Sequence, residues 1–155
     1  MLLLLALACP PLSARTLPLD RLDQPAPPLS LGGGRSLGDY QGQWVMLHFW
    51  ATWCTPCVRE LPALQRFEAR SAGTFVLLTV AMDGDNRALV EAFQQQHGIT
   101  LPVVLEQQAT GHAPFTGWGL PATYFIAPNG YVVARALGPR GWDAVEPTAL
   151  AGQLE

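Results

Sequence analysis

Short apolar runs alternate with amphipathic stretches over most of the chain. Each run is rich in Val, Leu, Phe or Tyr, and runs of this length are buried strands more often than helices. The five runs cover residues 44–50, 75–82, 101–105, 123–127 and 131–137. We therefore predict five strands inside a sheet.

Two stretches between these runs have their apolar residues at helical spacing. The first carries on one face Cys57, Leu61, Leu64 and Phe67. The second ends at Gly98 and carries Leu89, Val90, Phe93 and His97, of which His97 is expected only to end the helix. Strand and helix thus alternate, which predicts an α/β sheet with a parallel part.

The edges of this sheet carry turn signals. Asn129-Gly130 joins the last two apolar runs, and this dipeptide favours a tight hairpin because both residues tolerate positive φ. An antiparallel edge is therefore expected to complete the sheet. A final helix is expected after Trp142, with Pro147 in its first turn. Residues 29–37, with three glycines in the middle, predict a small leading hairpin.

The first 28 residues differ in composition from the rest. Residues 2–8 are apolar and end in Ala6-Leu7-Ala8, which has the small-residue spacing of a signal-peptidase site before Cys9. We interpret residues 1–14 as a secretory or lipoprotein signal, with Cys9 as the candidate lipid-anchoring residue. Residues 15–28 are interpreted as a Pro-rich tether and residues 29–155 as one folded domain.

Charge and cysteine content narrow the classes of function. The formal charge is −3, there is no Lys, and the arginines are scattered, so the clustered basic face of a nucleic-acid-binding protein is not expected. Three cysteines are too few for a disulfide framework or for a closed four-cysteine zinc site. Two of them, Cys54 and Cys57, form a C-x-x-C motif.

This motif follows a predicted strand and begins a predicted helix. Unpaired N–H groups and the helix dipole stabilise an anion at that position, and a thiolate is such an anion. We therefore expect a lowered pKa for Cys54, at the exposed tip, and assign it as the nucleophile. Cys57 lies one turn into the helix on its apolar face and is the resolving cysteine. Pro56 pre-sets the first helical turn.

Two segments of the sequence resemble the thioredoxin family. Residues 49–57, FWATWCTPC, resemble the signature F-W-A-x-W-C-x-P-C, and residues 119–123, GLPAT, resemble the G-x-P-T region with an extra Ala. The resemblance implies a cis-proline at Pro121 that faces the cysteine pair, and a helix-kinking proline at Pro62. It also implies that client segments bind to Trp53, Thr55, Pro56, Leu120 and Pro121.

A helix and a strand inserted over residues 83–107, together with the leading hairpin and the signal, are similar to the TlpA/ResA-like branch of membrane-tethered thiol-disulfide reductases. This branch implies a thioredoxin-like α/β fold, a central mixed sheet flanked by helices. It also implies that Glu60, three residues after Cys57, tunes the pair. His48 departs from the family pattern, which more often has Asp or Asn there. It is either a proton shuttle to Cys57 or a hydrogen-bonded core residue.

The resulting hypothesis is a monomeric extracytoplasmic enzyme, in the periplasm or on the outer face of the cytoplasmic membrane. It would reduce cysteine pairs of envelope proteins, in cytochrome c maturation or metal-site assembly. It would need no cofactor or metal, and a membrane thiol carrier would supply its electrons.

Two other functions remain open. The first is a copper-binding protein that uses Cys54, Cys57 and a histidine, either His48 or His112, although His112 is expected to be exposed. The second is a peroxiredoxin-type peroxidase, but such enzymes have Thr three residues before the reactive cysteine, where this chain has Ala51.

Overall fold

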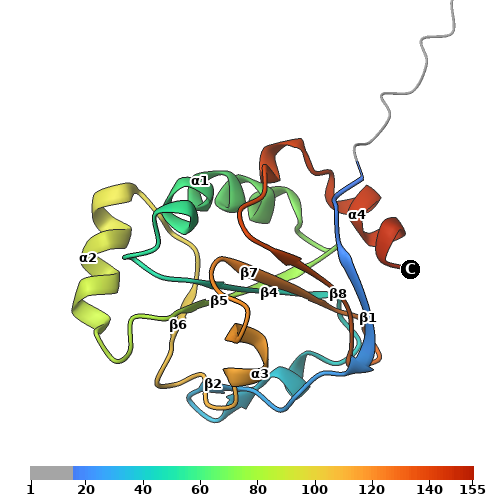
Figure 1. The fold of residues 1–155 in the computed structure, drawn as a ribbon, viewed down its shortest axis with the longest axis horizontal. Helices are drawn as coiled ribbons and strands as arrows, with labels where there is room; N and C mark the ends of the chain where they lie inside the picture. Colours follow the sequence, from blue (N-terminus) through green and yellow to red (C-terminus); the bar gives the residue numbers. More distant parts are fainter. Residues whose placement is uncertain (1–15) are drawn as a thin grey trace, which may run out of the picture.

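The core of the molecule is a six-stranded sheet with the order β1-β8-β7-β4-β5-β6 (Figure 1). The structure is a computed structural model that describes residues 16–155. The strands are β1 (Asp20–Pro25), β4 (Val45–Trp50), β5 (Val76–Ala81), β6 (Val103–Leu105), β7 (Ala122–Ile126) and β8 (Tyr131–Leu137). Strands β4, β5 and β6 run parallel, whereas β7 is antiparallel to β4 and to β8. The predicted mixed α/β sheet is confirmed.

Helices cover both faces of this sheet. They are α1 (Thr55–Arg70), α2 (Arg87–His97), α3 (Ala113–Thr116) and α4 (Pro147–Leu154), with 3-10 turns η1 (Leu37–Tyr40) and η2 (Trp142–Ala144). Figure 1 shows α1 and α4 on one side of the sheet, and α3 with the small hairpin of β2 (Ser30–Gly32) and β3 (Arg35–Ser36) on the other. Within the described residues, none of these helices has the length and apolar character needed to cross a bilayer.

Side chains of β4 alternate between two hydrophobic clusters. Met46 and Trp50 pack in the cluster under α1, whereas Leu47 and Phe49 pack in the cluster next to α3. Because side chains of a strand alternate in direction, His48 points to the same face as Met46 and Trp50. The strand that leads into the cysteine motif therefore presents its one polar residue to α1.

Most predicted boundaries are confirmed. Helix α2 ends at Gly98, whose φ of 64° is the left-handed conformation favoured after a helix. Pro147 is in the first turn of α4. The hairpin between β7 and β8 is present, and Gly130 has a φ of 83°, but Asn129 does not have the positive φ that the dipeptide allows. The four-residue helix α3 was not predicted, since its one turn is too short for a periodic pattern.

The expected start of the folded domain at residue 29 is wrong. Strand β1 lies inside the predicted tether and pairs antiparallel with β8 at the sheet edge. Leu17, before it, is buried. Most β1 side chains are exposed, so the pairing rests on backbone hydrogen bonds and leaves no apolar pattern to read. The predicted signal and its Cys9 lie outside the described residues.

Candidate active site

The cysteine motif lies where β4 passes into α1. Cys54 is the N-cap of α1, and its Sγ accepts a hydrogen bond from the backbone N–H of Cys57 at 3.3 Å. The two cysteines form a disulfide with Cα atoms 5.3 Å apart. The sulfurs thus sit beside N–H groups that have no partner within the helix, where a thiolate would be stabilised after reduction.

The two sulfurs have different surroundings. Cys54 lines an open cleft of about 600 Å³, whereas Cys57 does not. Cys57 is fully buried on the inner face of α1, and Cys54 keeps 6% exposure. Cys54 is therefore the more accessible cysteine, as predicted, although in the oxidised protein it is largely covered rather than at an exposed tip.

The cleft brings together most of the residues predicted to bind a client. Its lining includes Trp53, Thr55, Pro56 and Leu120, and Trp53 is 69% exposed at its rim. Pro121 does not line it, but the Leu120–Pro121 peptide bond is cis, as the resemblance implied. The role of these residues in client binding stays a prediction.

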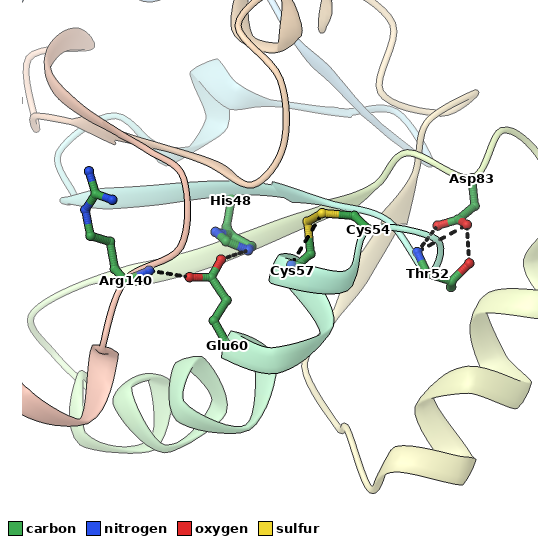
Figure 2. Close-up of a disulfide and its surroundings, with 7 residues drawn as sticks. All are labelled: His48, Thr52, Cys54, Cys57, Glu60, Asp83 and Arg140. Atoms are coloured by element: carbon green, nitrogen blue, oxygen red, sulfur yellow. Dashed lines mark hydrogen bonds and ion pairs between the residues drawn. A yellow bond between two sulfur atoms is a disulfide. The ribbon is translucent and has the colours of Figure 1, made fainter.

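The loop before Cys54 is held by a carboxylate from another strand end. Asp83, which follows β5, accepts hydrogen bonds from the backbone N–H of Thr52, at 3.1 Å, and from its hydroxyl (Figure 2). The same segment also caps α2, through the side chain of Asn86. The contact of Asp83 with Thr52 fixes the segment that positions Cys54.

His48 and Glu60 lie side by side next to Cys57 (Figure 2). His48 Nε2 lies 3.4 Å from Glu60 Oε1, and His48 Nδ1 lies 2.9 Å from the hydroxyl of Thr123. Glu60 Oε2 accepts hydrogen bonds from the backbone N–H of Arg140, at 2.8 Å, and the indole N–H of Trp142, at 3.1 Å. Glu60 is thus a buried, hydrogen-bonded helix residue and not a solvated one.

Burial changes the protonation of both side chains. It lowers the pKa of His48 to about 3, so the imidazole is neutral at physiological pH. Burial also raises the pKa of Glu60 to about 7, against the opposing effect of the Arg140 and Trp142 hydrogen bonds and the Arg140 charge. The carboxyl group therefore changes protonation near neutral pH beside a neutral imidazole.

Comparison with known proteins places these residues in a family. Residues 22–135 match the AhpC/TSA family. The chain belongs to the AhpC/TSA family. A curated relative, the thiol-disulfide oxidoreductase ResA of Geobacillus kaustophilus, is 34% identical over 101 residues, which are 65% of this chain and 58% of the relative. The chain thus spans less than two thirds of that relative's length, and the resemblance to ResA expected from the sequence is confirmed.

Two solved structures have the same fold as this AhpC/TSA-family chain. A thiol:disulfide interchange protein of the thioredoxin family from Chlorobium tepidum has a TM-score of 0.67 at 24% identity, covering 88% of this chain and 99% of its own. The exposed lipoprotein thioredoxin of Streptococcus pneumoniae has a TM-score of 0.56 at 26% identity, covering 79% and 94%. The thioredoxin-like fold is confirmed.

Several residues of the site in this AhpC/TSA-family chain were missed from the sequence. Arg140 and Trp142 were not singled out, because their contacts to Glu60 span about eighty residues and leave no local pattern. Glu106 and Met82 line the cleft with Cys54, as does His112, which was expected to be exposed. His97 ends α2 and packs on Phe93, with ring centroids 4.3 Å apart.

The copper alternative needs a third ligand beside the two cysteines. His112 lines the same cleft as Cys54, whereas His48 has Thr123 at one ring nitrogen and Glu60 near the other. Across residues 16–155, no three His, Cys, Asp or Glu side chains are grouped so that they could hold a metal ion.

Proposed function

We propose that the chain is a thiol-disulfide oxidoreductase that reduces cysteine pairs in other proteins. The observation that carries this proposal is the Cys54–Cys57 disulfide at the start of α1, with Cys54 alone of the pair facing the open cleft. The name of the ResA relative, a thiol-disulfide oxidoreductase, supports it.

The reaction is two consecutive thiol-disulfide exchanges. The Cys54 thiolate attacks one sulfur of a client disulfide, forms a mixed disulfide, and releases the other client sulfur as a thiolate. Cys57 then loses its proton and attacks Cys54, which releases the second client thiol and forms the Cys54–Cys57 disulfide. Two electrons pass to the client. A dithiol donor must return two electrons before the next cycle.

Glu60 and His48 are proposed to take part in the second exchange. Cys57 must lose a proton while buried, and Glu60, three residues later on the same helix, has its pKa raised to about 7. The ionised carboxylate can take up that proton, directly or through the imidazole of His48, 3.4 Å away. Glu60→Gln should slow the second exchange by about 10- to 100-fold, and more than it slows the first. Rapid-mixing measurements with a client peptide separate the two steps.

We further propose an extracytoplasmic location. An apolar segment at residues 2–8 precedes Cys9, and the solved pneumococcal homologue is described as an exposed lipoprotein. Residues 10–16, between Cys9 and the buried Leu17, would then tether the domain near the membrane, close to a thiol carrier that supplies electrons in an oxidising compartment. Clients would be envelope proteins with cysteine pairs, in cytochrome c maturation or metal-site assembly.

The reduction potential of the Cys54–Cys57 pair tests the direction of electron flow. Equilibration of the whole chain with glutathione and dithiothreitol buffers should give a value at or below roughly −220 mV, in the range of the reductants. Reduction of insulin disulfides by the wild-type protein should be lost in Cys54→Ser. A potential near −120 mV, as in strong oxidants, would mean that the protein donates disulfides instead.

A further inference from the structure

One wall of the cleft that Cys54 lines is polar, and its residues come from the segment between β5 and α3. Its two charged or titratable side chains are those of Glu106 and His112, which are 33% and 25% exposed. Glu106 Oε2 accepts a hydrogen bond from the backbone N–H of Gly84 at 2.9 Å. His112 Nδ1 lies 2.9 Å from the carbonyl oxygen of Ala109. Both side chains are therefore held in place before a client binds.

The carboxylate of Glu106 is the charged group that this wall presents to the cleft. Its Oε2 is held by the N–H of Gly84, and its Oε1 lies 3.6 Å from His112 Nε2. A carbonyl oxygen only accepts, so Nδ1 of His112 donates to Ala109 and fixes the ring beside Glu106. A group with several N–H donors, such as a guanidinium or an ammonium ion, can donate to this partly exposed carboxylate from the open side of the cleft.

The carboxylates on this wall have no arginine or lysine side chain beside them in the described lining. A second cleft, of about 530 Å³, shares Glu106 and His112 with the first and adds Asp85. Among the described residues that line the two clefts, there is no arginine, and the chain contains no lysine. A segment that places its cysteine at Cys54 and extends along the wall therefore meets acceptors and negative charge.

We propose that Glu106 binds a Lys or Arg side chain close to the cysteine of the client, and so selects clients with such a residue. This inference rests on the proposed oxidoreductase function. It makes Glu106 a specificity-determining residue at some distance from the sulfurs. The segment between β5 and α3 then selects the client, whereas the cysteine motif reacts with it.

Three peptides that differ in one residue test the proposal. Each carries one cysteine in a mixed disulfide with 5-thio-2-nitrobenzoate, and Arg, Gln or Glu stands two positions away. The reduced wild-type chain should release thionitrobenzoate from the Arg peptide about fivefold faster than from the Gln peptide, and slowest from the Glu peptide. High salt should reduce the difference, because the groups are partly exposed.

Two variants locate the effect. Glu106→Gln keeps an acceptor for the N–H of Gly84 and should remove most of the preference for the Arg peptide. Glu68→Gln makes the same change in charge at an exposed position of α1 that does not line the cleft, and should keep the preference.

The outcomes separate this proposal from the function on which it rests. Equal rates of the wild-type protein with the three peptides would overturn it, as would an undiminished preference in Glu106→Gln. Failure of the wild-type protein to release thionitrobenzoate from any peptide would instead contradict the oxidoreductase function.

Discussion

Cys54 and Cys57 belong to one motif but face two different regions of the molecule. Cys54 lines the open cleft, together with side chains from several separate segments of the chain. Cys57 lies on the buried face of α1, which also carries Glu60, and Glu60 lies beside His48. The cleft is open to solvent, whereas the region around the His48–Glu60 pair is buried.

This difference explains why the two cysteines take different parts in the proposed reaction. The first attack needs access and an already formed thiolate, which the start of α1 favours. The second attack needs no access, since the mixed disulfide is already on Cys54, but it needs removal of a proton in a buried environment. The cleft therefore gives the first attack its access, and the buried His48–Glu60 pair gives the second attack a place for the proton.

The largest predicted effect separates the two cysteines. Cys57→Ser retains the sulfur that faces the cleft, so it should form a stable mixed disulfide with a client peptide but complete no cycle. Cys54→Ser should form no such adduct, and its turnover should fall by more than about 10³-fold. Intact-mass spectrometry of each variant, after incubation with the peptide disulfide, measures the adduct. Equal amounts of adduct in the two variants would contradict the assignment.

Glu60→Gln tests whether the buried region is a proton site. Because the pKa of Glu60 is raised to about 7 from the usual 4.5, the folded protein binds more protons than the unfolded protein between these values, and stability is lost as the pH rises through them. Gln does not titrate, so the free energy of unfolding of the variant should gain on the wild type by up to about 3 kcal/mol from pH 4.5 to 7.

The difference in stability between the wild type and Glu60→Gln removes the pH dependence that other titrating groups cause in both proteins. The lowered pKa of His48 makes both proteins gain stability as the pH rises from about 3 to 6.5, so it contributes equally to each. Urea denaturation at a series of pH values gives the difference. Glu68→Gln, on the exposed side of the same helix, should show no such trend. A difference that is flat with pH would mean that folding does not raise the pKa of Glu60.

The sequence predicted the cleft side of this comparison better than the buried side. The strand-to-helix position of the motif and the ends of α2 depend on local signals, such as a strand ending before the cysteines or Gly98 after a helix. The cis bond at Pro121 was implied by the family resemblance. His48 was noticed because it interrupts an apolar run. That Glu60 is its partner becomes clear only when the alternation of side chains along β4 is known to direct His48 to α1.

What could not be predicted depends on contacts between distant segments. Trp142 and Arg140 reach Glu60 from the loop after β8, and neither residue type requires a buried glutamate as a partner. Strand β1 was missed for a related reason, because an edge strand with exposed side chains is defined by the strand it pairs with. Pairing of this kind is a property of the assembled sheet.

Trp142→Phe tests how far the indole N–H of Trp142 controls the pKa of Glu60. The indole N–H donates to Glu60 Oε2 at 3.1 Å, and the ring packs on Phe67 with centroids 5.6 Å apart. Phe keeps an aromatic ring but no donor, so the Glu60 carboxylate loses one stabilising contact and its pKa should rise further, by about one unit. The same urea series should show the loss of stability at higher pH than in the wild type. An unchanged midpoint would assign the control of Glu60 to the N–H of Arg140.

The smallest predicted effect belongs to the rim of the cleft. Trp53 is 69% exposed, so Trp53→Ala should change the free energy of unfolding by less than about 0.5 kcal/mol. It should nevertheless raise the KM for a client peptide by about three- to tenfold, because an aromatic surface next to Cys54 is lost. Trp118 provides a matched control: it is 64% exposed, does not line the cleft, and lies under the guanidinium of Arg135 at 4.5 Å. Trp118→Ala should change KM less. If both variants raise KM equally, clients contact a wider surface than the cleft. The open side of the motif would then include the surface around Trp118 and Arg135 of β8.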